Sequence, residues 1–334
     1  MKEPVVVGFG SALVDILISE TDGFIETSGI QKGGMVLVEE KDLHAVLRKT
    51  KAQPAVVPGG SACNTMIGIA KLGGKARFVG KCGPGEMGFL FEDHLMRDGV
   101  EARLEKCCTK TGRVVSIVTP DAQRSMLTYL GASAEITPQD IRPQCLDDAA
   151  FAHIEGYLCH QGDLIHHIQA LAKRAGARIC LDLASYTVIE AHRDKLDTLV
   201  RNGVDILIAN EDEAAAFTGA RTDRDQVKAL ANAAPIAVLK VGKRGSYIAA
   251  NGDVLHIPAL GDGDAVDTTG AGDLWAAGFL YGLSRGYSLE HAGKLASLCG
   301  YEVCQVMGAK ISEDGWKRIR ESAQQLKTTH DSGQ

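Results

Sequence analysis

The sequence predicts an α/β fold in which a mostly parallel central sheet is covered by helices on both faces. From residue 162 to residue 241, short apolar runs alternate with stretches whose apolar residues follow helical periodicity. Strands that are apolar throughout are typical of a sheet buried on both faces, and the helix between two such strands provides the crossover that parallel pairing requires. The 334 residues, 45% of them hydrophobic, are enough to bury a large core.

Each element of this alternation follows from its local pattern. A continuous apolar run bounded by polar residues or glycine predicts a buried strand, and apolar residues on a helical period predict a helix. We expect strands at residues 4–10, 75–80, 178–183, 205–209 and 236–241. We expect helices at residues 62–73, 86–97, 164–175, 189–201 and from residue 211 onward.

Two stretches interrupt the alternation. Residues 16–40 contain two short strand-like pieces, and residues 101–130 contain two apolar runs on either side of a Pro120-Asp121 turn, which predict a β-hairpin. Such pieces could extend an edge of the main sheet. They could equally form a small lid over the carboxyl ends of the parallel strands, where open α/β sheets bind their ligands.

Charge, apolar-run length and cysteine spacing argue against several classes of protein. A net charge of −6 argues against a nucleic-acid binder, which needs basic groups for phosphate contacts. No apolar run reaches the roughly 18 to 20 residues of a membrane helix, and no signal-peptide pattern precedes the first expected strand. The nine cysteines include no C-x-x-C pair, so we expect a reduced, cytoplasmic protein. The histidines at positions 160, 166 and 167 lack zinc-ligand spacing and are expected on a solvated helix.

The segment Asp267-Thr268-Thr269-Gly270-Ala271-Gly272-Asp273 is the most informative of the glycine-rich stretches. It precedes an apolar run at 274–283 that predicts a buried helix, and the free N–H groups of a first helical turn bind anions. Because Gly270, Ala271 and Gly272 have small side chains or none, a phosphate could approach the backbone closely. Asp273 beside such a site suits a general base for phosphoryl transfer, although Asp in a first turn also serves as plain dipole compensation.

A second glycine group, Pro58-Gly59-Gly60-Ser61-Ala62-Cys63-Asn64, also leads into an expected helix. The backbone at Gly59 and Gly60 and the side chain of Asn64 are candidates for contacts with a polyhydroxylated ligand. The alternative is a tight turn in which Ser61 caps the helix.

A third group, Gly8-Phe9-Gly10, begins like a dinucleotide-binding fingerprint, but Leu13 stands where the third glycine is required. This argues against a dinucleotide-dependent oxidoreductase. Asp15, just after the first strand, is interpreted instead as an acceptor for two ligand hydroxyls. The sequence also lacks G-x-x-x-x-G-K-[ST], which excludes a Walker-type nucleotide site.

Taken in order, these motifs resemble the ribokinase-like (PfkB) family of sugar and nucleoside kinases over nearly the whole chain. The two family signatures match residues 58–73 and 267–273, and intermediate landmarks match residues 210–213 and 240–245. The resemblance implies a ribokinase-like fold: a doubly covered, mostly parallel sheet with a small antiparallel β-lid. The implied single kinase unit has its α/β core at residues 1–15, 41–100 and 132–334 and its lid at residues 16–40 and 101–131.

The resemblance further implies ATP-dependent transfer of the γ-phosphate to a hydroxymethyl group of a sugar or nucleoside. Asp273 matches the catalytic base, with Gly270, Ala271 and Gly272 as its anion hole. The substrate positions match Asp15, Gly59, Gly60 and Asn64. The element that organises Mg²⁺ and phosphates through water matches Asn210 and Glu213, and the nucleotide wall matches Lys240, Gly242 and Gly245. A monovalent-cation loop, occupied by K⁺ in many members, matches Asp267, Thr269, Val303, Gly308 and Ser312.

The resemblance has two departures and leaves the substrate, the oligomeric state and an alternative function open. Lys240 stands where many members have threonine, which leaves the nucleotide contacts there open, and residues 129–133 are closer to the adenosine-kinase-like branch. Substrate choice is expected to lie in lid side chains such as Ser116, Met126 and Tyr129, in the order nucleoside, ribose-like sugar, keto-sugar acid. The exposed lid edge suggests a homodimer. The alternative function is a non-catalytic sugar- or nucleoside-sensing protein on the same fold.

Overall fold

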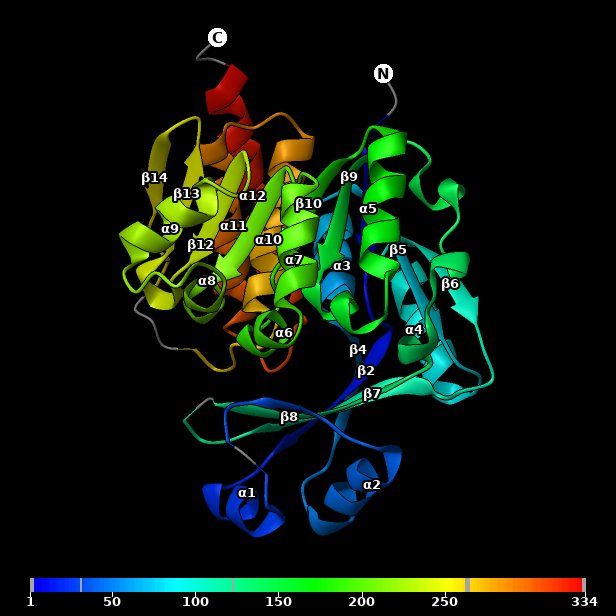
Figure 1. Cartoon of the computed structure of the whole chain (residues 1–334). Coiled ribbons are helices and arrows are strands. Elements are labelled where there is room, and N and C mark those ends of the chain that lie inside the picture. Colours follow the sequence, from blue (N-terminus) through cyan, green and yellow to red (C-terminus); the bar gives the residue numbers. More distant parts are fainter. Residues whose placement is uncertain (1–2, 31, 122, 262–264, 332–334) are drawn as a thin grey trace.

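Two β-sheets organise the chain (Figure 1), in a computed structural model that describes residues 3–30, 32–121, 123–261 and 265–331. The strands of the large sheet are β1 (Val5–Phe9), β5 (Lys75–Cys82), β6 (Val100–Lys106), β9 (Ala149–Glu155), β10 (Arg178–Asp182), β11 (Ile206–Asn210), β12 (Ile236–Lys240), β13 (Ser246–Ala250) and β14 (Asp253–Ile257). Their order is β14-β13-β12-β11-β10-β9-β1-β5-β6, and pairing is parallel from β6 to β12 and antiparallel at β13 and β14.

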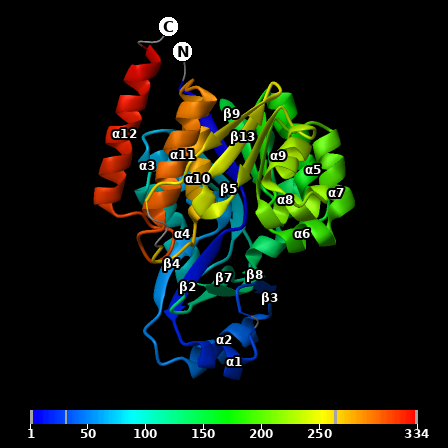
Figure 2. The same cartoon turned by 90° about the vertical axis from the view of Figure 1, so that its left-hand side faces the viewer.

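Helices cover both faces of the large sheet, as Figure 2 shows edge-on. One layer contains α3 (Ser61–Lys71), α4 (Glu86–Arg97), α10 (Ala271–Ser284), α11 (Leu289–Val303) and α12 (Glu313–Asp331). The other contains α5 (Leu164–Ala175), α6 (Tyr186–Ala191), α7 (Arg193–Arg201), α8 (Glu211–Thr218) and α9 (Asp223–Ala231). Side chains alternate between two buried cores: Val6 of β1 packs in one, and its neighbours Val5 and Val7 pack in the other. The expected α/β fold with a doubly covered sheet is confirmed.

The smaller sheet lies beyond one end of the large sheet and has the order β3-β8-β7-β2-β4. Its strands are β2 (Leu13–Ser19), β3 (Met35–Leu37), β4 (Ala55–Gly59), β7 (Thr111–Val118) and β8 (Arg124–Gly131). Two helices, α1 (Asp22–Ser28) and α2 (Glu40–Lys49), pack on one face through a separate apolar core that includes Ile16, Leu43, Val115 and Leu127. The opposite face turns toward the carboxyl ends of the large sheet. We call this smaller unit, residues 13–59 and 111–131, the lid.

The lid boundaries differ from those expected from the sequence. Residues 41–59 were assigned to the core, but α2 packs on the lid sheet and β4, at residues 55–59, pairs with β2 as an edge strand of the lid. The short, Pro58-containing segment gave no strand signal, and an edge strand is where a sheet tolerates proline. Conversely, residues 101–106 were assigned to the lid, but β6 pairs with β5 at the edge of the large sheet. Its alternating apolar and polar residues reflect a half-buried edge rather than a lid strand.

The other expected strands and helices are present close to their expected bounds, with one exception, whereas β9, β13 and β14 were not expected. The helix expected at 189–201 is divided at His192 into α6 and α7. All nine cysteines are free, as expected for a reduced chain. Within the described ranges, no helix is both long and apolar enough to cross a membrane. Exposed Val36 and Val56 lie on the two edge strands of the lid, where the expected homodimer contact stays a prediction.

Candidate active site

Four polar residues end four neighbouring strands of the large sheet, and the parallel pairing places them at one edge. Glu155 ends β9 and pairs in register with Asp182 at the end of β10, and Asn210 ends β11 in register with Lys240 at the end of β12. With the lid face and the first turn of α10, these residues line a cavity of about 270 Å³. Carboxyl ends of parallel strands are where α/β sheets bind ligands, so this cavity is the candidate active site.

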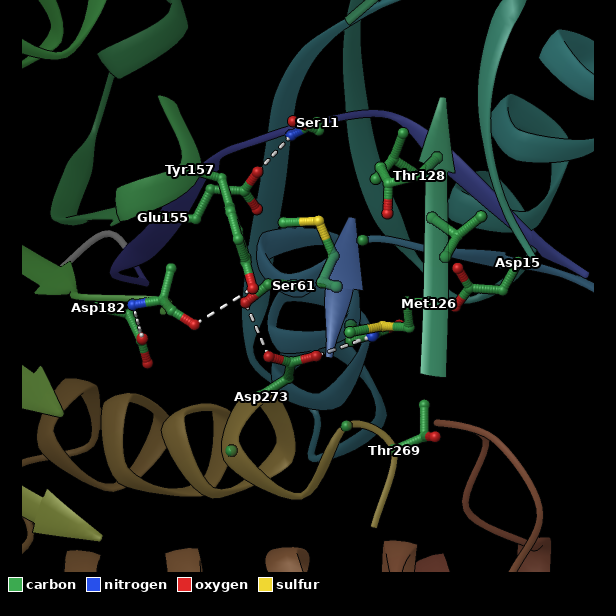
Figure 3. A pocket seen from close by; sticks show the side chains of 18 of the residues that line it. Ser11, Asp15, Ser61, Met126, Thr128, Glu155, Tyr157, Asp182, Thr269 and Asp273 are labelled. Atoms are coloured by element: carbon green, nitrogen blue, oxygen red, sulfur yellow. Dashed lines mark hydrogen bonds between the residues drawn. The ribbon is translucent and has the colours of Figure 1, made fainter. Parts of the chain in front are cut away.

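Asp273 lies in the first turn of α10 and is held by two side chains of α3. Ser61 donates its hydroxyl to Oδ1 at 2.7 Å, and Asn64 donates its amide to Oδ2 at 2.9 Å. A third contact, from the Thr65 hydroxyl to the Asp273 carbonyl at 3.1 Å, fixes the two helices to each other. Figure 3 shows Asp273 projecting into the pocket, with Asp15 and Asp182 on opposite sides of it. The structure therefore joins the two glycine-rich segments into one site.

The pKa of Asp273 is raised above its ordinary value of 3.8, chiefly because burial disfavours the charged form. The hydrogen bonds from Asn64 and Ser61 act in the opposite direction because they stabilise the carboxylate. A carboxylate whose pKa is raised accepts a proton more readily, which is what a general base requires.

The turn before α10 has the geometry of an anion site. Gly270 is the N-cap residue with φ +75°, and a Cβ there would lie 2.6 Å from the Cβ of Ala309, so glycine is required both by conformation and by space. The N–H of Ala271 donates to the Thr268 carbonyl at 3.2 Å. The next N–H groups, of Gly272 and Asp273, belong to a first turn and so have no acceptor within the helix. Because Gly272 and Asp273 line the cavity, the positive end of the α10 dipole lies at the cavity wall.

Asp15 reaches the same cavity from the lid strand β2. It is partly buried, and burial raises its pKa to about 6, while the guanidinium of Arg124 lowers it. Gly59 pairs with Leu13 on the adjoining strand, and a Cβ on Gly59 would collide with the Asp15 carboxylate. Glycine at position 59 therefore leaves room for Asp15. Of the four residues expected at the substrate, Asp15, Gly60 and Asn64 line the cavity together and Gly59 does not, and their role in substrate binding stays a prediction.

Glu155 connects the two points at which the chain passes between core and lid. It is 1% exposed, and its carboxylate accepts the N–H of Ser11 at 2.8 Å and the N–H of Ala62 at 3.0 Å. Ser11 lies between β1 of the core and β2 of the lid. Ala62 lies in the first turn of α3, which follows lid strand β4. Gly10 has no room for a Cβ because the Glu155 carboxylate and Ala62 occupy that space. Burial raises the pKa of Glu155 to about 7.

Asn210 and Glu213 form a reciprocal capping box at the start of α8. The Asn210 backbone and side-chain amides donate to Glu213 at 2.8 and 2.6 Å, and the Glu213 N–H donates to Asn210 at 2.9 Å. Glu213 is 3% exposed, and burial raises its pKa. Both residues line the same cavity as Asp273 rather than the cavity that Gly242 lines. Since the Glu213 oxygens are already engaged, contact with Mg²⁺ through water fits this arrangement better than direct ligation.

A second cavity, of about 410 Å³, adjoins the first along the nucleotide wall expected from the sequence. Gly242 and Gly245 line it, together with apolar side chains that include Trp275 and Leu260. Four residues line both cavities: Lys240, Thr268, Ala271 and Gly272. The anion turn therefore lies between a cavity of mixed polar and apolar lining and a largely apolar one, which suits a phosphate chain that connects a base to an acceptor.

The residues expected in a monovalent-cation loop are only partly brought together. Asp267 is fully buried, and its carboxylate accepts the Thr269 N–H and hydroxyl at 2.9 and 2.7 Å and the Gly308 N–H at 2.8 Å. These bonds join the anion turn to the loop after α11. Val303 ends α11, and Ser312 accepts the Gly315 N–H at 3.1 Å at the start of α12. K⁺ binding by the carbonyls of this loop stays a prediction.

Two side chains differ from their expected positions. Tyr129 was expected to face the substrate, but it packs against the lid core on the side of α1 and α2, because strand alternation places it on the same face as Leu127. Met126 faces the cavity as expected, and Thr128, which was not expected there, lies beside it (Figure 3). His160, expected on a solvated helix, lies in a 3₁₀ turn at Gly156–His160, lines the cavity and hydrogen-bonds His192 at 2.9 Å.

Sequence reasoning missed three charged residues of the site. Glu155 and Asp182 are acidic ends of otherwise apolar runs, a signal that could have marked the carboxyl edge of the sheet. Arg124 projects from the lid hairpin into the cavity and forms no ion pair with another residue in the described part of the chain. Among the described residues, no group of three or more histidine, cysteine or acidic side chains is arranged to hold a metal directly.

Comparison with known proteins identifies the family. The description "pfkB family carbohydrate kinase" matches residues 35–315, a span that includes both glycine-rich signatures. The chain belongs to the pfkB family of carbohydrate kinases. The expected resemblance and the ribokinase-like fold are confirmed, and ATP binding follows from membership in a family of sugar and nucleoside kinases.

Similar proteins with solved structures match nearly the whole chain. A probable sugar kinase from Rhizobium etli CFN 42 has a TM-score of 0.91 and 31% identity, covering 97% of this chain and 99% of that one. The adenosine kinase from Sinorhizobium meliloti has a TM-score of 0.90 and 32% identity, covering 96% and 100%. By sequence, the probable fructokinase-5 of Arabidopsis thaliana is 26% identical over 330 residues, covering 92% of this chain and 93% of that protein.

Proposed function

We propose that this pfkB protein transfers the γ-phosphoryl group of ATP to a hydroxymethyl group of a sugar or nucleoside, with Asp273 as general base. The observation that carries the proposal is the position of Asp273. It lies at the N-terminus of α10, held by Ser61 and Asn64, where a cavity of mixed lining meets a largely apolar one. An acceptor hydroxyl in the first cavity and a nucleotide base in the second would have the phosphate chain between them at this turn.

The transfer follows from the arrangement of donors and acceptors. The acceptor oxygen attacks the γ-phosphorus, its proton passes to the Asp273 carboxylate, and the bond from phosphorus to the leaving oxygen of ADP breaks. The N–H groups of the 270–272 turn and of Asp273 stabilise the negative charge on the phosphoryl oxygens. Mg²⁺, held through water near Asn210 and Glu213, would supply further positive charge to the phosphates. The carboxylates of Asp15, Glu155, Asp182, Glu213 and Asp273 make the cavity acidic and support a requirement for such a cation.

The substrate side supports a ribose-containing acceptor. Asp15 and Asn64 offer a carboxylate and an amide to hydroxyls, and Met126 and Tyr157 add apolar area along the same cavity. The Tyr157 phenol donates to the Ala184 carbonyl at 3.2 Å, which fixes the ring at the cavity wall. A ring beside hydroxyl acceptors suits a nucleoside, and the adenosine kinase from Sinorhizobium meliloti is among the similar structures. We therefore place nucleosides ahead of ribose-like sugars and keto-sugar acids.

An acceptor screen tests the proposal. The protein is incubated with MgATP and, separately, nucleosides, pentoses, hexoses or sugar acids, with and without K⁺, and ADP and phosphorylated acceptor are measured by mass spectrometry. We expect acceptor-dependent ADP release that requires Mg²⁺, is strongest with a nucleoside and is lost in Asp273→Asn. ADP release that no acceptor stimulates, or that Asp273→Asn retains, would contradict it.

A further inference from the structure

Lys240 has its ammonium group at the anion turn. It is the last residue of β12, and its Nζ lies 3.1 Å from Oδ2 of Asp182. A Cβ placed on Gly272 would stand 3.0 Å from the same Nζ. The absence of a side chain at Gly272 therefore lets a cation approach the first turn of α10 as closely as a phosphate could.

The position of Lys240 between the two cavities is the second observation. Its side chain is 16% exposed and lines both the cavity of Asp273 and the cavity of Gly242. A residue that only formed a wall for a nucleotide base would face one cavity. The ammonium instead lies at the junction, which a phosphoryl group has to cross on its way from nucleotide to acceptor.

The charges around Lys240 keep it protonated. Burial acts to lower its pKa, but Asp182, Glu213 and Asp273 raise it, and the net direction is upward. On β9, which pairs with the Asp182 strand β10, the imidazole of His153 is fully buried with a pKa lowered to about 4, so it adds no charge at neutral pH. Asp182 also accepts the Ala184 N–H at 2.9 Å, which orients its carboxylate toward Lys240.

We propose that Lys240 is a catalytic residue of the phosphoryl transfer, whose ammonium contacts the transferred phosphoryl group at the anion turn, and that Asp182 is the positioning residue that holds it there. This inference rests on the proposed function and adds a side-chain cation to an anion site otherwise built from backbone. A fixed ammonium is most effective in a site closed to water, where charge is poorly screened.

The competing explanation is structural: Lys240 neutralises Asp182, which is itself 9% exposed in its side chain. The two explanations differ for the double variant Lys240→Met/Asp182→Asn, in which neither residue leaves an unpaired charge. If Lys240 serves only Asp182, the double variant recovers both stability and turnover. If Lys240 acts on the phosphoryl group, the double variant recovers stability alone.

Steady-state kinetics of four variants test this. We expect Lys240→Met to lower kcat by about 10²- to 10³-fold, the usual cost of one anion-stabilising group, with little change in the KM for the acceptor. Lys240→Arg should retain more activity than Lys240→Met, and Lys240→Met/Asp182→Asn should be as slow as Lys240→Met. Lys228→Met, at an exposed position of α9 that lines neither cavity, is the matched control and should equal the wild type. Recovery of turnover in the double variant would overturn the proposal while leaving the proposed function intact.

A binding measurement provides a readout without turnover. Affinities for Mg-ADP and for the non-hydrolysable analogue Mg-AMP-PNP are measured by calorimetry in the wild type and in Lys240→Met, with thermal unfolding as a check on folding. Because the analogue carries a γ-phosphoryl group and ADP does not, we expect its affinity to fall at least about tenfold more than that of ADP. Equal losses would overturn the contact to the γ-phosphoryl group. A wild type that binds neither nucleotide would overturn the proposed function and this inference together.

Discussion

Asn64 donates a hydrogen bond of 2.9 Å to the carboxylate of Asp273 across 209 positions of sequence. Ser61, one turn earlier on α3, donates to the other carboxylate oxygen at 2.7 Å. The segment that sequence analysis assigned to substrate and the segment assigned to phosphate therefore share one carboxylate. Any change in the α3 donors should act on the proton affinity of Asp273, and through it on catalysis.

Replacing Ser61 by alanine should shift the pH dependence of turnover. The Ser61 hydroxyl stabilises the charged form of Asp273, so its loss raises the pKa of Asp273 further above the ordinary value. A hydrogen bond to a charged group contributes about 1.5 to 3 kcal/mol, so we expect the acid limb of the kcat profile to move upward by about one pH unit or more. Ser28→Ala, on α1 of the lid, is the control. An acid limb that does not move would show that Ser61 does not influence the pKa of the catalytic base.

Replacing Gly59 by alanine should weaken acceptor binding. The added Cβ would collide with the Asp15 carboxylate and displace it from the cavity. We expect the acceptor KM to rise by about tenfold or more, as for a lost charge-assisted hydrogen bond, with the KM for ATP nearly unchanged. Gly23→Ala, on α1, is the matched control, because the nearest atom to its added Cβ is 3.8 Å away. An unchanged acceptor KM would remove Asp15 from the substrate site.

Glu155→Gln should change how stability depends on pH. Burial raises the pKa of Glu155 from 4.5 to about 7, so between these values the folded state binds more protons than the unfolded state. The free energy of unfolding of the wild type therefore falls as pH rises through this window. Glutamine cannot titrate, so the variant lacks this component.

Urea unfolding at pH values across that window measures the difference. The free energy of unfolding of Glu155→Gln minus that of the wild type should increase by about 3 kcal/mol between the two pKa values of Glu155. A loss of unfolding free energy that does not depend on pH is also expected. The glutamine NH₂ group, a donor, would face the N–H of either Ser11 or Ala62, both of which donate to the carboxylate in the wild type. Parallel curves for the two proteins would show that Glu155 does not titrate in this range.

Sequence patterns predicted β1, β5, β10, β11 and β12 because these strands contain continuous apolar runs, and they predicted the helices whose apolar residues are periodic. Strands β9, β13 and β14 of the same sheet were not predicted. The lid was harder. Its strand at 55–59 is short and contains proline, so only its pairing with β2 makes it a strand. The expectation that Tyr129 faces the substrate was wrong for a related reason. Neighbouring residues of a strand face opposite sides of the sheet, and the sequence of residues 125–130 does not show which of them face the cavity and which face the lid core.

The site was predicted where the chemistry lies in local motifs and missed where it depends on distant segments. The 267–273 turn shows its small residues and its carboxylate in one stretch of sequence. Glu155 is different, because its role comes from Ser11 and Ala62, which are brought to it from two other parts of the chain. The Lys240–Asp182 ion pair likewise exists only because β10 and β12 end at the same edge of the sheet.

The central claim is that Asp273 takes the proton of the acceptor hydroxyl. The most direct test compares kcat and acceptor KM of the wild type and Asp273→Asn with the best acceptor from the screen. Asparagine keeps the shape of the side chain and cannot accept the proton, so we predict a fall in kcat of about 10²-fold or more, with the acceptor KM changed by no more than a few-fold. Undiminished kcat in a correctly folded Asp273→Asn variant would contradict the account.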